Sequence, residues 1–109
     1  MVTQTNYVFQ AVADPTRRAI LDRLRGGGQA VNQIASRFEV SRPAISKHLR
    51  VLLDAQLVTE IREGRNHVYR LNVQPLRDLD RWLDQYRALW AVNLQNLKKH
   101  VEAKVRKPQ

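Results

Sequence analysis

The most informative absence in this 109-residue chain is cysteine, of which it has none. Without thiols the chain can form neither a disulfide nor a thiolate metal site. It also has no apolar run that approaches the roughly 18–20 residues of a membrane-spanning helix. Residues 1–6 are polar and no apolar stretch follows them, so we expect no secretory signal. These absences predict a soluble, cytoplasmic protein with no membrane partner.

Acidic residues are scarce relative to basic ones. Ten Asp and Glu stand against nineteen Lys and Arg, which gives a formal net charge of +9. This balance favours a polyanionic partner, because basic side chains release the counterions of a nucleic acid on binding. Charge alone does not distinguish DNA, RNA and an anionic membrane surface. The length and the hydrophobic fraction of 43% suit one domain, which we assign to residues 1–109.

Signatures of catalysis and of nucleotide binding are missing as well. The glycine triplet at residues 26–28 has neither a P-loop nor a dinucleotide pattern around it, so we interpret it as a helix terminator. The three histidines have no acidic partner at a spacing that suggests a catalytic pair. The aspartates and arginines of residues 77–87 predict a solvated, ion-paired helix face. We therefore expect no enzymatic activity.

The chain does contain a short amphipathic helix, predicted for residues 42–54. Ser41 is a favourable N-cap, and Pro43 suits the first turn, where its missing N–H leaves no hydrogen bond unmade. Apolar residues at helical spacing predict its buried face: Ile45, Leu49, Leu52 and Leu53. The opposite face is basic and hydroxylic, with no acid until Asp54: Arg42, Ser46, Lys47 and Arg50. Such a face suits phosphates and base edges, and a merely solvated face is the alternative.

Three helices are predicted before this one. Residues 7–12 are mainly apolar, and Asp14 with Pro15 then begins a second helix that ends at the glycine triplet. A third helix is predicted for residues 31–38, followed by a short turn. Ala35 is small enough to let this helix cross the 42–54 helix closely. The pair therefore predicts a helix-turn-helix.

A β-hairpin is predicted directly afterwards, over residues 57–72. Apolar and polar residues alternate on its arms, and Gly64 and Asn66 offer the positive φ that a hairpin turn requires. The hairpin carries Arg62 and Arg70 on its arms and Arg65 at its tip. A basic hairpin in this place predicts a wing that contacts the minor groove or the DNA backbone. A structural hairpin with exposed charges is the alternative.

The last predicted helix, residues 75–104, is too long for a small domain to cover. About thirty helical residues span roughly 45 Å, whereas a domain of this size has a radius of gyration of about 13 Å. Its apolar stripe should therefore pack against a second copy in a symmetric dimer. We predict an interface on the following residues: Leu79, Trp82, Leu83, Tyr86, Trp90, Leu94 and Leu97.

Three segments carry a resemblance to a known family: residues 13–21 (ADPTRRAIL), residues 40–58 (VSRPAISKHL through Leu57 and Val58) and residues 62–65 (REGR). On these segments the chain resembles the ArsR family of winged-helix bacterial repressors, over nearly its whole length. The resemblance implies four helices, a two-stranded hairpin and a fifth helix, in that order. It also implies a homodimer formed through the first and last helices, including Tyr7 and Phe9. The function implied is repression through an imperfect palindrome of double-stranded DNA, with the chain's own promoter as a candidate site.

The resemblance further implies which residues contact DNA. Residues around the start of the 42–54 helix would enter the major groove: Ser41, Arg42, Ser46 and Lys47. Phosphate contacts are implied for His48 and Arg50, and wing contacts for Arg62 and Arg65. Arg42 is the strongest candidate for reading a base, since arginine can bind O6 and N7 of guanine together.

The chain departs from many relatives in the residues that sense a signal. Many relatives carry thiolates in the third helix, or a carboxylate–histidine pair with further histidines on the last helix. Here the third helix has Asn32 and Gln33, and the last helix offers Asp80, Asp84, His100 and Glu102. Zinc sites need three or four convergent ligands, so we expect no metal and no cofactor. Two alternatives stay open: a metal-responsive repressor with His, Asp or Glu ligands, and a winged-helix module for protein contacts. The effector is not identified.

Overall fold

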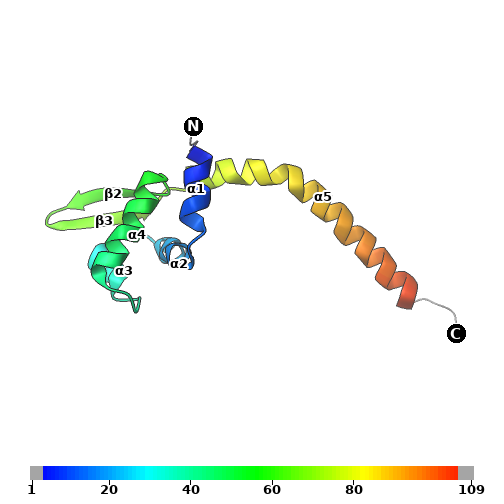
Figure 1. Ribbon diagram of the computed structural model, residues 1–109, viewed down its shortest axis with the longest axis horizontal. Helices are drawn as coiled ribbons and strands as arrows, with labels where there is room; N and C mark the ends of the chain where they lie inside the picture. The colour runs from blue at the N-terminus through cyan, green and yellow to red at the C-terminus, as the bar shows by residue number, and fades with distance from the viewer. Residues whose placement is uncertain (1–3, 106–109) are drawn as a thin grey trace. The chain divides into compact units, whose positions relative to one another are not determined.

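The computed structural model describes residues 4–105, and the chain divides after Asp78 into two units. The first unit contains every element up to the start of the last helix, and the second contains the rest of that helix. The elements follow in this order (Figure 1): α1 Gln4–Val12, α2 Pro15–Leu24, β1 Gln29–Ala30, α3 Val31–Ala35, α4 Arg42–Asp54, β2 Val58–Glu63, β3 Asn66–Leu71 and α5 Gln74–Val105. The predicted mainly helical fold with a β-hairpin is confirmed.

The corner between α1 and α2 is built by the segment that begins at Asp14. The Asp14 carboxylate caps α2, because its Oδ2 accepts from the Arg17 amide at 3.0 Å. The Arg17 side chain turns back to α1, where Nε donates to the Ala11 carbonyl at 2.8 Å and Nη2 to the Gln10 carbonyl at 2.9 Å. Arg18 binds the next two carbonyls in the same way. These donors satisfy carbonyls that a helix end leaves unpaired, and they fix the angle between the two helices.

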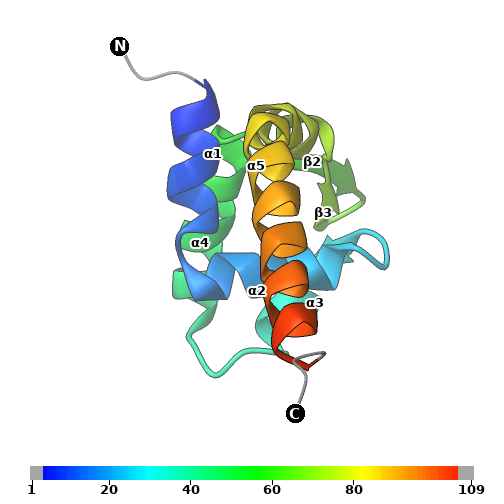
Figure 2. The ribbon, with the colours of Figure 1, turned by 90° about the vertical axis from the view of Figure 1, so that its right-hand side faces the viewer.

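The core of the first unit lies where α4 packs against α1, α2 and α3, which Figure 2 shows from the side. Its buried apolar residues are Val8, Ala11, Ile20, Leu21, Leu24, Ile34, Ile45, Leu49, Leu52, Ala55, Leu57 and Val58. Each fully buried Leu or Ile contributes about 1.5–3 kcal/mol relative to exposure. The predicted buried face of α4 is confirmed, except that Leu53 is half-buried.

Helix α3 is shorter than predicted and ends at Ala35 rather than at residue 38. The Ser36 hydroxyl donates to the Gln33 carbonyl at 2.8 Å and so offers that carbonyl a partner outside the helical ladder. The next amides, those of Arg37 and Phe38, bond three residues back, to Ile34 and Ala35, so the chain continues in tight turns. The connection between α3 and α4 is correspondingly longer than predicted, while α4 matches its predicted range of 42–54.

The hairpin has a third strand beside it that the sequence analysis did not predict. Strand β1 pairs antiparallel with β3, opposite residues 68–69, so the sheet order is β1-β3-β2. The residue before β1 is Gly28, where an added Cβ would lie 2.8 Å from Cγ1 of Val68 and 2.9 Å from Cγ of Arg70. A glycine is needed there because the strand approaches the wing this closely.

The turn of the hairpin uses one glycine. Glu63 and Asn66 are cross-strand partners, which leaves Gly64 and Arg65 as a two-residue loop. Gly64 has φ +62°, whereas neither Arg65 nor Asn66 has a positive φ. This is the pattern of a type II′ turn, in which the first central residue is glycine. The prediction of a positive φ at Asn66 is therefore wrong, because Asn66 is the first residue of β3.

The end of α4 has an unusual residue in a common motif. Gln56 has φ +60° and donates its amide to the Leu53 carbonyl at 2.9 Å, and the Leu57 amide bonds to the Leu52 carbonyl at 3.0 Å. This pair of bonds is the Schellman motif, whose left-handed position usually holds glycine. Two side-chain amides hold the backbone there: Gln4 Nε2 donates to the Ala55 carbonyl at 2.5 Å, and Asn72 Nδ2 donates to the Gln56 carbonyl at 2.8 Å.

Helix α5 occupies residues 74–105, close to its predicted range. Arg87 pairs with Asp84 at 2.7 Å and also with Asp80, and these pairs lie on the solvated, ion-paired face that was predicted. The Trp82 and Tyr86 rings pack with their centroids 4.9 Å apart. None of the described helices combines the length and the apolar content that crossing a membrane requires.

Candidate nucleic-acid interface

The N-terminus of α4 is held by its cap. Ser41 is in an extended conformation, and its Oγ accepts from the Ala44 amide at 3.3 Å. Pro43 occupies the first turn, as predicted. The serine hydroxyl keeps its own hydrogen for donation to an acceptor outside the protein, such as a phosphate oxygen.

The outer face of α4 is exposed and positively charged. Arg42, Ser46, Lys47 and Arg50 are all exposed. Arg50 pairs with Asp54 at 3.5 Å, one helical turn further on. Within the described residues, Arg42 and Lys47 have no ion-pair partner, so their charges are available to an external anion. The buried Ile45 and Leu49 behind them fix the helix in the core and so fix the direction of this face.

His48 is half-buried on the side of α4 that faces the start of α2. Its Nδ1 lies 3.3 Å from Arg17 Nη1 and 3.8 Å from Asp14 Oδ2. Because arginine only donates hydrogen bonds, Nδ1 is the acceptor, and the ring proton of neutral His48 is on Nε2. Nε2 of His48 has no hydrogen-bond partner among the described residues. No side-chain nitrogen or oxygen in that part of the chain is both buried and without a partner, so Nε2 is accessible to solvent. The sequence prediction of a phosphate contact at His48 stays a prediction, with Nε2 as its donor.

The Asp14 carboxylate is held in its charged form by its surroundings. The hydrogen bond from the Arg17 amide lowers the pKa of Asp14 below its ordinary value, and the charge that His48 carries when protonated and the charge of Arg17 add to this effect, although desolvation opposes it. Residues 14, 17 and 48 therefore form one polar contact between α1, α2 and α4. Sequence reasoning missed it, because it depends on packing between segments about thirty residues apart.

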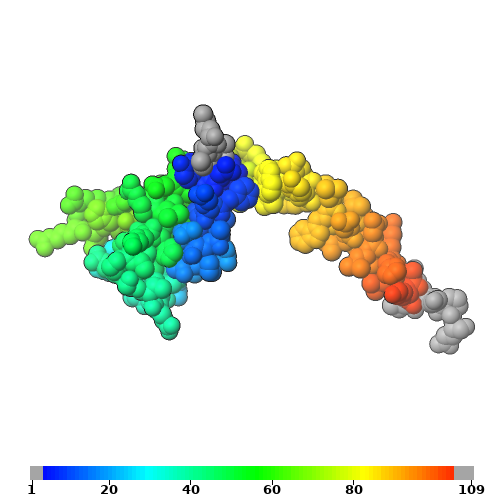
Figure 3. Space-filling model, in the orientation of Figure 1, coloured from blue at the N-terminus to red at the C-terminus, as the bar shows by residue number. Residues whose placement is uncertain are grey.

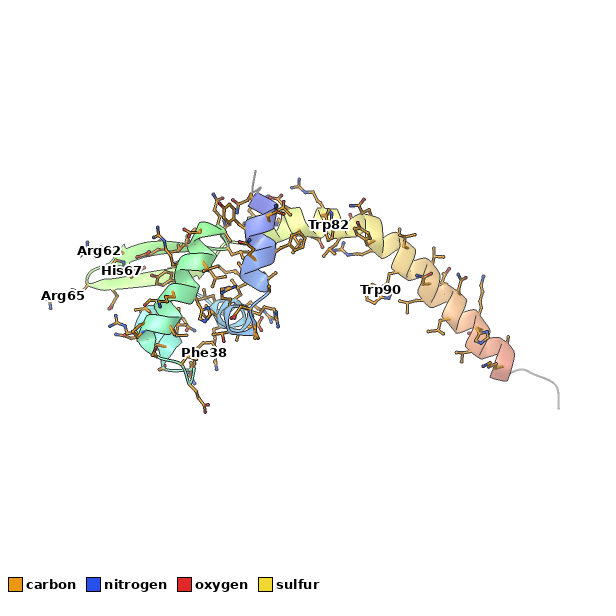
Figure 4. All side chains as sticks on the ribbon, in the orientation of Figure 1. Phe38, Arg62, Arg65, His67, Trp82 and Trp90 are labelled. Atoms are coloured by element: carbon orange, nitrogen blue, oxygen red, sulfur yellow. The ribbon has the colours of Figure 1, made fainter. Side chains whose placement is uncertain are left out.

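The wing, formed by β2, β3 and their turn, projects beyond the helices of the first unit (Figure 3). Arg65 is at its tip, with Arg62 and His67 just behind it on the two strands (Figure 4). Within the described residues, Arg62 and Arg65 have no ion-pair partner. Arg70, which was also predicted as part of a basic wing, is paired with Glu63 at 3.7 Å. The free positive charge therefore gathers at the tip.

Glu60 adds a contact to the wing that sequence reasoning missed. Its carboxylate Oε1 forms a short hydrogen bond with Nδ1 of His67. The two residues are seven apart in sequence and lie on the same face of the hairpin, because Glu60 is opposite Tyr69 and Arg62 is opposite His67. Placing the turn at residues 64–65 would have revealed this pairing from the sequence.

Most of the apolar residues predicted for a dimer interface are exposed in the single chain. On α1, Tyr7 and Phe9 are exposed, and on α5 Leu79 is half-buried and the others are exposed: Trp82, Leu83, Tyr86, Trp90, Leu94 and Leu97. Trp90, labelled in Figure 4, is 65% exposed. Large apolar side chains at helical spacing with this exposure mark an interaction surface.

The described residues 4–105 contain no group of three or more His, Cys, Asp or Glu side chains that could hold a metal ion. His48 lies on α4, His67 on the wing and His100 on α5. Asn32 and Gln33 are exposed on α3. The metal-responsive alternative gains no support from these positions.

Comparisons with known proteins agree with this geometry. The family model described as a helix-turn-helix domain matches residues 12–61, from the end of α1 to β2. The transcriptional repressor SdpR of Bacillus subtilis is 44% identical over 78 residues, which cover 72% of this chain and 87% of SdpR.

Solved structures give the same result. An ArsR-like transcriptional regulator from Rhodococcus is 35% identical, with a TM-score of 0.70 over 88% of this chain and 91% of that one. The homodimeric winged helix-turn-helix DNA-binding domain of Mb0332 from Mycobacterium bovis is 29% identical, with a TM-score of 0.61 over 85% and 83% of the two chains. These relatives are regulators and not enzymes. The chain belongs to the ArsR family of winged helix-turn-helix transcriptional regulators.

Proposed function

We propose that this regulator is a homodimeric repressor that binds a palindromic operator in double-stranded DNA. The observation that carries the proposal is the outer face of α4, whose exposed basic residues have no acid among them until Asp54. The helix is directed by its buried face, so these side chains extend to one side together. Two such helices, related by the two-fold axis of a dimer, would read two half-sites about one helical turn apart.

Within each half-site, we assign base reading to the first turns of α4. Arg42 is exposed and unpaired, so its guanidinium can bind O6 and N7 of a guanine. Lys47 and Ser46 lie one turn further along the same exposed face. Arg50, which shares its charge with Asp54, is assigned to the phosphate backbone.

The wing supplies the neighbouring contacts in this proposal. Arg62 and Arg65 carry the unpaired charge at its tip, and a basic hairpin beside a reading helix suits the minor groove or its phosphates. Arg70 is left out of the proposed contacts because Glu63 neutralises it.

Dimerisation is assigned to the apolar faces of α1 and α5. Tyr7 and Phe9 on the first helix and the tryptophans on the last are exposed in a single chain, and a second copy would cover them. The same interface would make residues 79–105 part of a folded domain. We place the dimer in the cytoplasm, with the promoter of its own gene as a candidate operator.

The test is binding of the purified dimer to labelled duplexes, followed by fluorescence anisotropy. The region upstream of the gene is compared with a scrambled duplex of equal length. Arg42→Ala should reduce discrimination at one base pair by about 1–3 kcal/mol. Arg65→Ala should weaken binding to both duplexes and reduce the salt slope by about one. Arg23→Ala removes an equal charge from α2, outside the proposed interface, and should change little. Equal binding of wild type to specific and scrambled DNA would sink the proposal.

A further inference from the structure

The wing carries a histidine, His67, whose two ring nitrogens differ in their hydrogen bonding. His67 is at the start of β3, directly opposite Arg62 on β2. Its Nδ1 is hydrogen-bonded to the Glu60 carboxylate, and within residues 4–105 its Nε2 has no partner. The His67 side chain is 49% exposed and lies just behind the tip, next to Arg62 (Figure 4).

The bond to Glu60 determines what the other side of the ring can do. An ionised carboxylate only accepts hydrogen bonds, so Nδ1 must carry a proton. In a neutral imidazole the second nitrogen then has a lone pair and no hydrogen. A bare Nε2 would face a phosphate oxygen acceptor to acceptor, which is repulsive. Only the imidazolium can keep the bond to Glu60 and also donate from Nε2.

We propose that His67 contacts a DNA phosphate as an imidazolium, and that each wing takes up one proton from solvent at Nε2 when it binds. The inference rests on the proposed function. Glu60 is the positioning residue, because it fixes the ring and provides a counter-charge on the protein side. The proton that is taken up bonds to Nε2 and is shared with the phosphate oxygen.

The charges around His67 agree with this assignment. On its face of the hairpin are Glu60, Arg62 and Tyr69, and Arg65 is in the adjoining turn. Burial, with a contribution from the charge of Glu60, raises the pKa of Tyr69, so that phenol stays neutral. A phosphate placed against the tip supplies a negative charge on the outer side of the ring, opposite the carboxylate of Glu60.

His48 is the internal comparison, because its ring is oriented the opposite way. Its Nδ1 accepts from Arg17, so the neutral ring already presents a hydrogen at Nε2. A phosphate contact at His48 requires no added proton. The two histidines therefore predict different responses to pH, since histidine is the side chain that ordinarily changes charge between about pH 5 and 8.

The experiment measures operator affinity of the full-length dimer from about pH 6 to pH 8.5 at constant ionic strength, across the range in which histidine titrates. Wild-type affinity should fall as the pH rises, by up to about tenfold per pH unit for each proton taken up. His67→Gln keeps a donor near Nε2 but cannot titrate. The affinity of this variant should therefore no longer depend on pH, while its preference for the operator over other duplexes remains. Glu60→Gln keeps an acceptor for Nδ1 without the counter-charge, so the affinity of this variant should begin to fall at a lower pH than that of the wild type. Calorimetry in two buffers of different ionisation heat counts the protons directly.

The control variant is His48→Asn, whose amide oxygen can still accept from Arg17. It should retain the wild-type slope. A slope that survives in His67→Gln, or that disappears in His48→Asn, overturns the inference and leaves the proposed function intact. A wild-type affinity for a specific operator that does not change with pH also overturns the inference and leaves the proposed function intact. A wild-type dimer that prefers no duplex overturns the proposed function, and this inference with it.

Discussion

Replacing Gln56 by glycine should make the protein more stable. Gln56 follows the last turn of α4 with φ +60°, and its own side chain is exposed. Both hydrogen bonds of the motif, and the bond from Asn72, use backbone atoms of residues 52–57 that a glycine retains. The substitution therefore removes the strained Cβ and nothing that holds the chain.

The size of the gain follows from two opposing terms. A left-handed conformation costs an L residue with a Cβ about 1–2 kcal/mol. Glycine in turn loses more conformational freedom on folding, which costs about 0.5–1 kcal/mol. The net gain should be about 0.5–1 kcal/mol. For a folded unit of 60–100 residues this raises Tm by roughly 2–8 °C.

The measurement is reversible urea unfolding followed by far-ultraviolet circular dichroism at fixed protein concentration. Two variants control for other effects. Gln56→Ala keeps the Cβ and should bring no gain. Lys47→Gly places the same residue in the right-handed interior of α4 and should cost about 0.7–1 kcal/mol. A destabilised Gln56→Gly, or an equal gain from Gln56→Ala, would refute the reasoning.

Three further predictions concern other parts of the chain. Asp14→Asn should destabilise the protein above about pH 4, the ordinary pKa of the acid. The pKa of Asp14 is lowered in the folded protein, so its charged form stabilises the fold, and this stability is lost only as the pH falls through the folded-state pKa. Unfolding at several pH values should show the free energies of unfolding of the two proteins converging in acid. Gly28→Ala should cost about 1–3 kcal/mol, since its Cβ would meet a valine methyl at 2.8 Å, whereas Gly26→Ala meets nothing within 4 Å and should be neutral or stabilising in the same assay. Trp90→Ala should weaken the dimer by about 2 kcal/mol or more per subunit in sedimentation equilibrium, and an unchanged dissociation constant would exclude this tryptophan from the interface.

The helix-turn-helix was predictable because its signals are local. Ser41, Pro43 and the apolar spacing behind them specify where α4 begins and which face is buried, and both agree with the structure. The long apolar stripe of α5 is equally visible in sequence. Helix α3 was predicted too long, because the apolar residue Phe38 continues its spacing while the Ser36 hydroxyl competes for a carbonyl of the helix.

Contacts between distant segments were not predictable in this way. Strand β1 is two residues long and follows three glycines, so it has no alternation of its own, and only its pairing with β3 makes it a strand. The contact of His48 with Asp14 and Arg17 depends on how α2 packs against α4. The bond between Glu60 and His67 depends on the hairpin register, which an incorrect positive φ at Asn66 obscured.

Helix α1 is fastened at both ends: Gln4 holds its start to the last turn of α4, and Arg17 and Arg18 hold its end to α2. These hydrogen bonds couple the position of α1 to those of α2 and α4. Half-sites about one helical turn apart demand a fixed separation of the two reading helices. In the proposed dimer, a change in how the two α1 helices meet would therefore alter the separation of the two reading helices. The proposed subunit contact and the proposed DNA contact are thus linked through the hydrogen bonds at the two ends of α1.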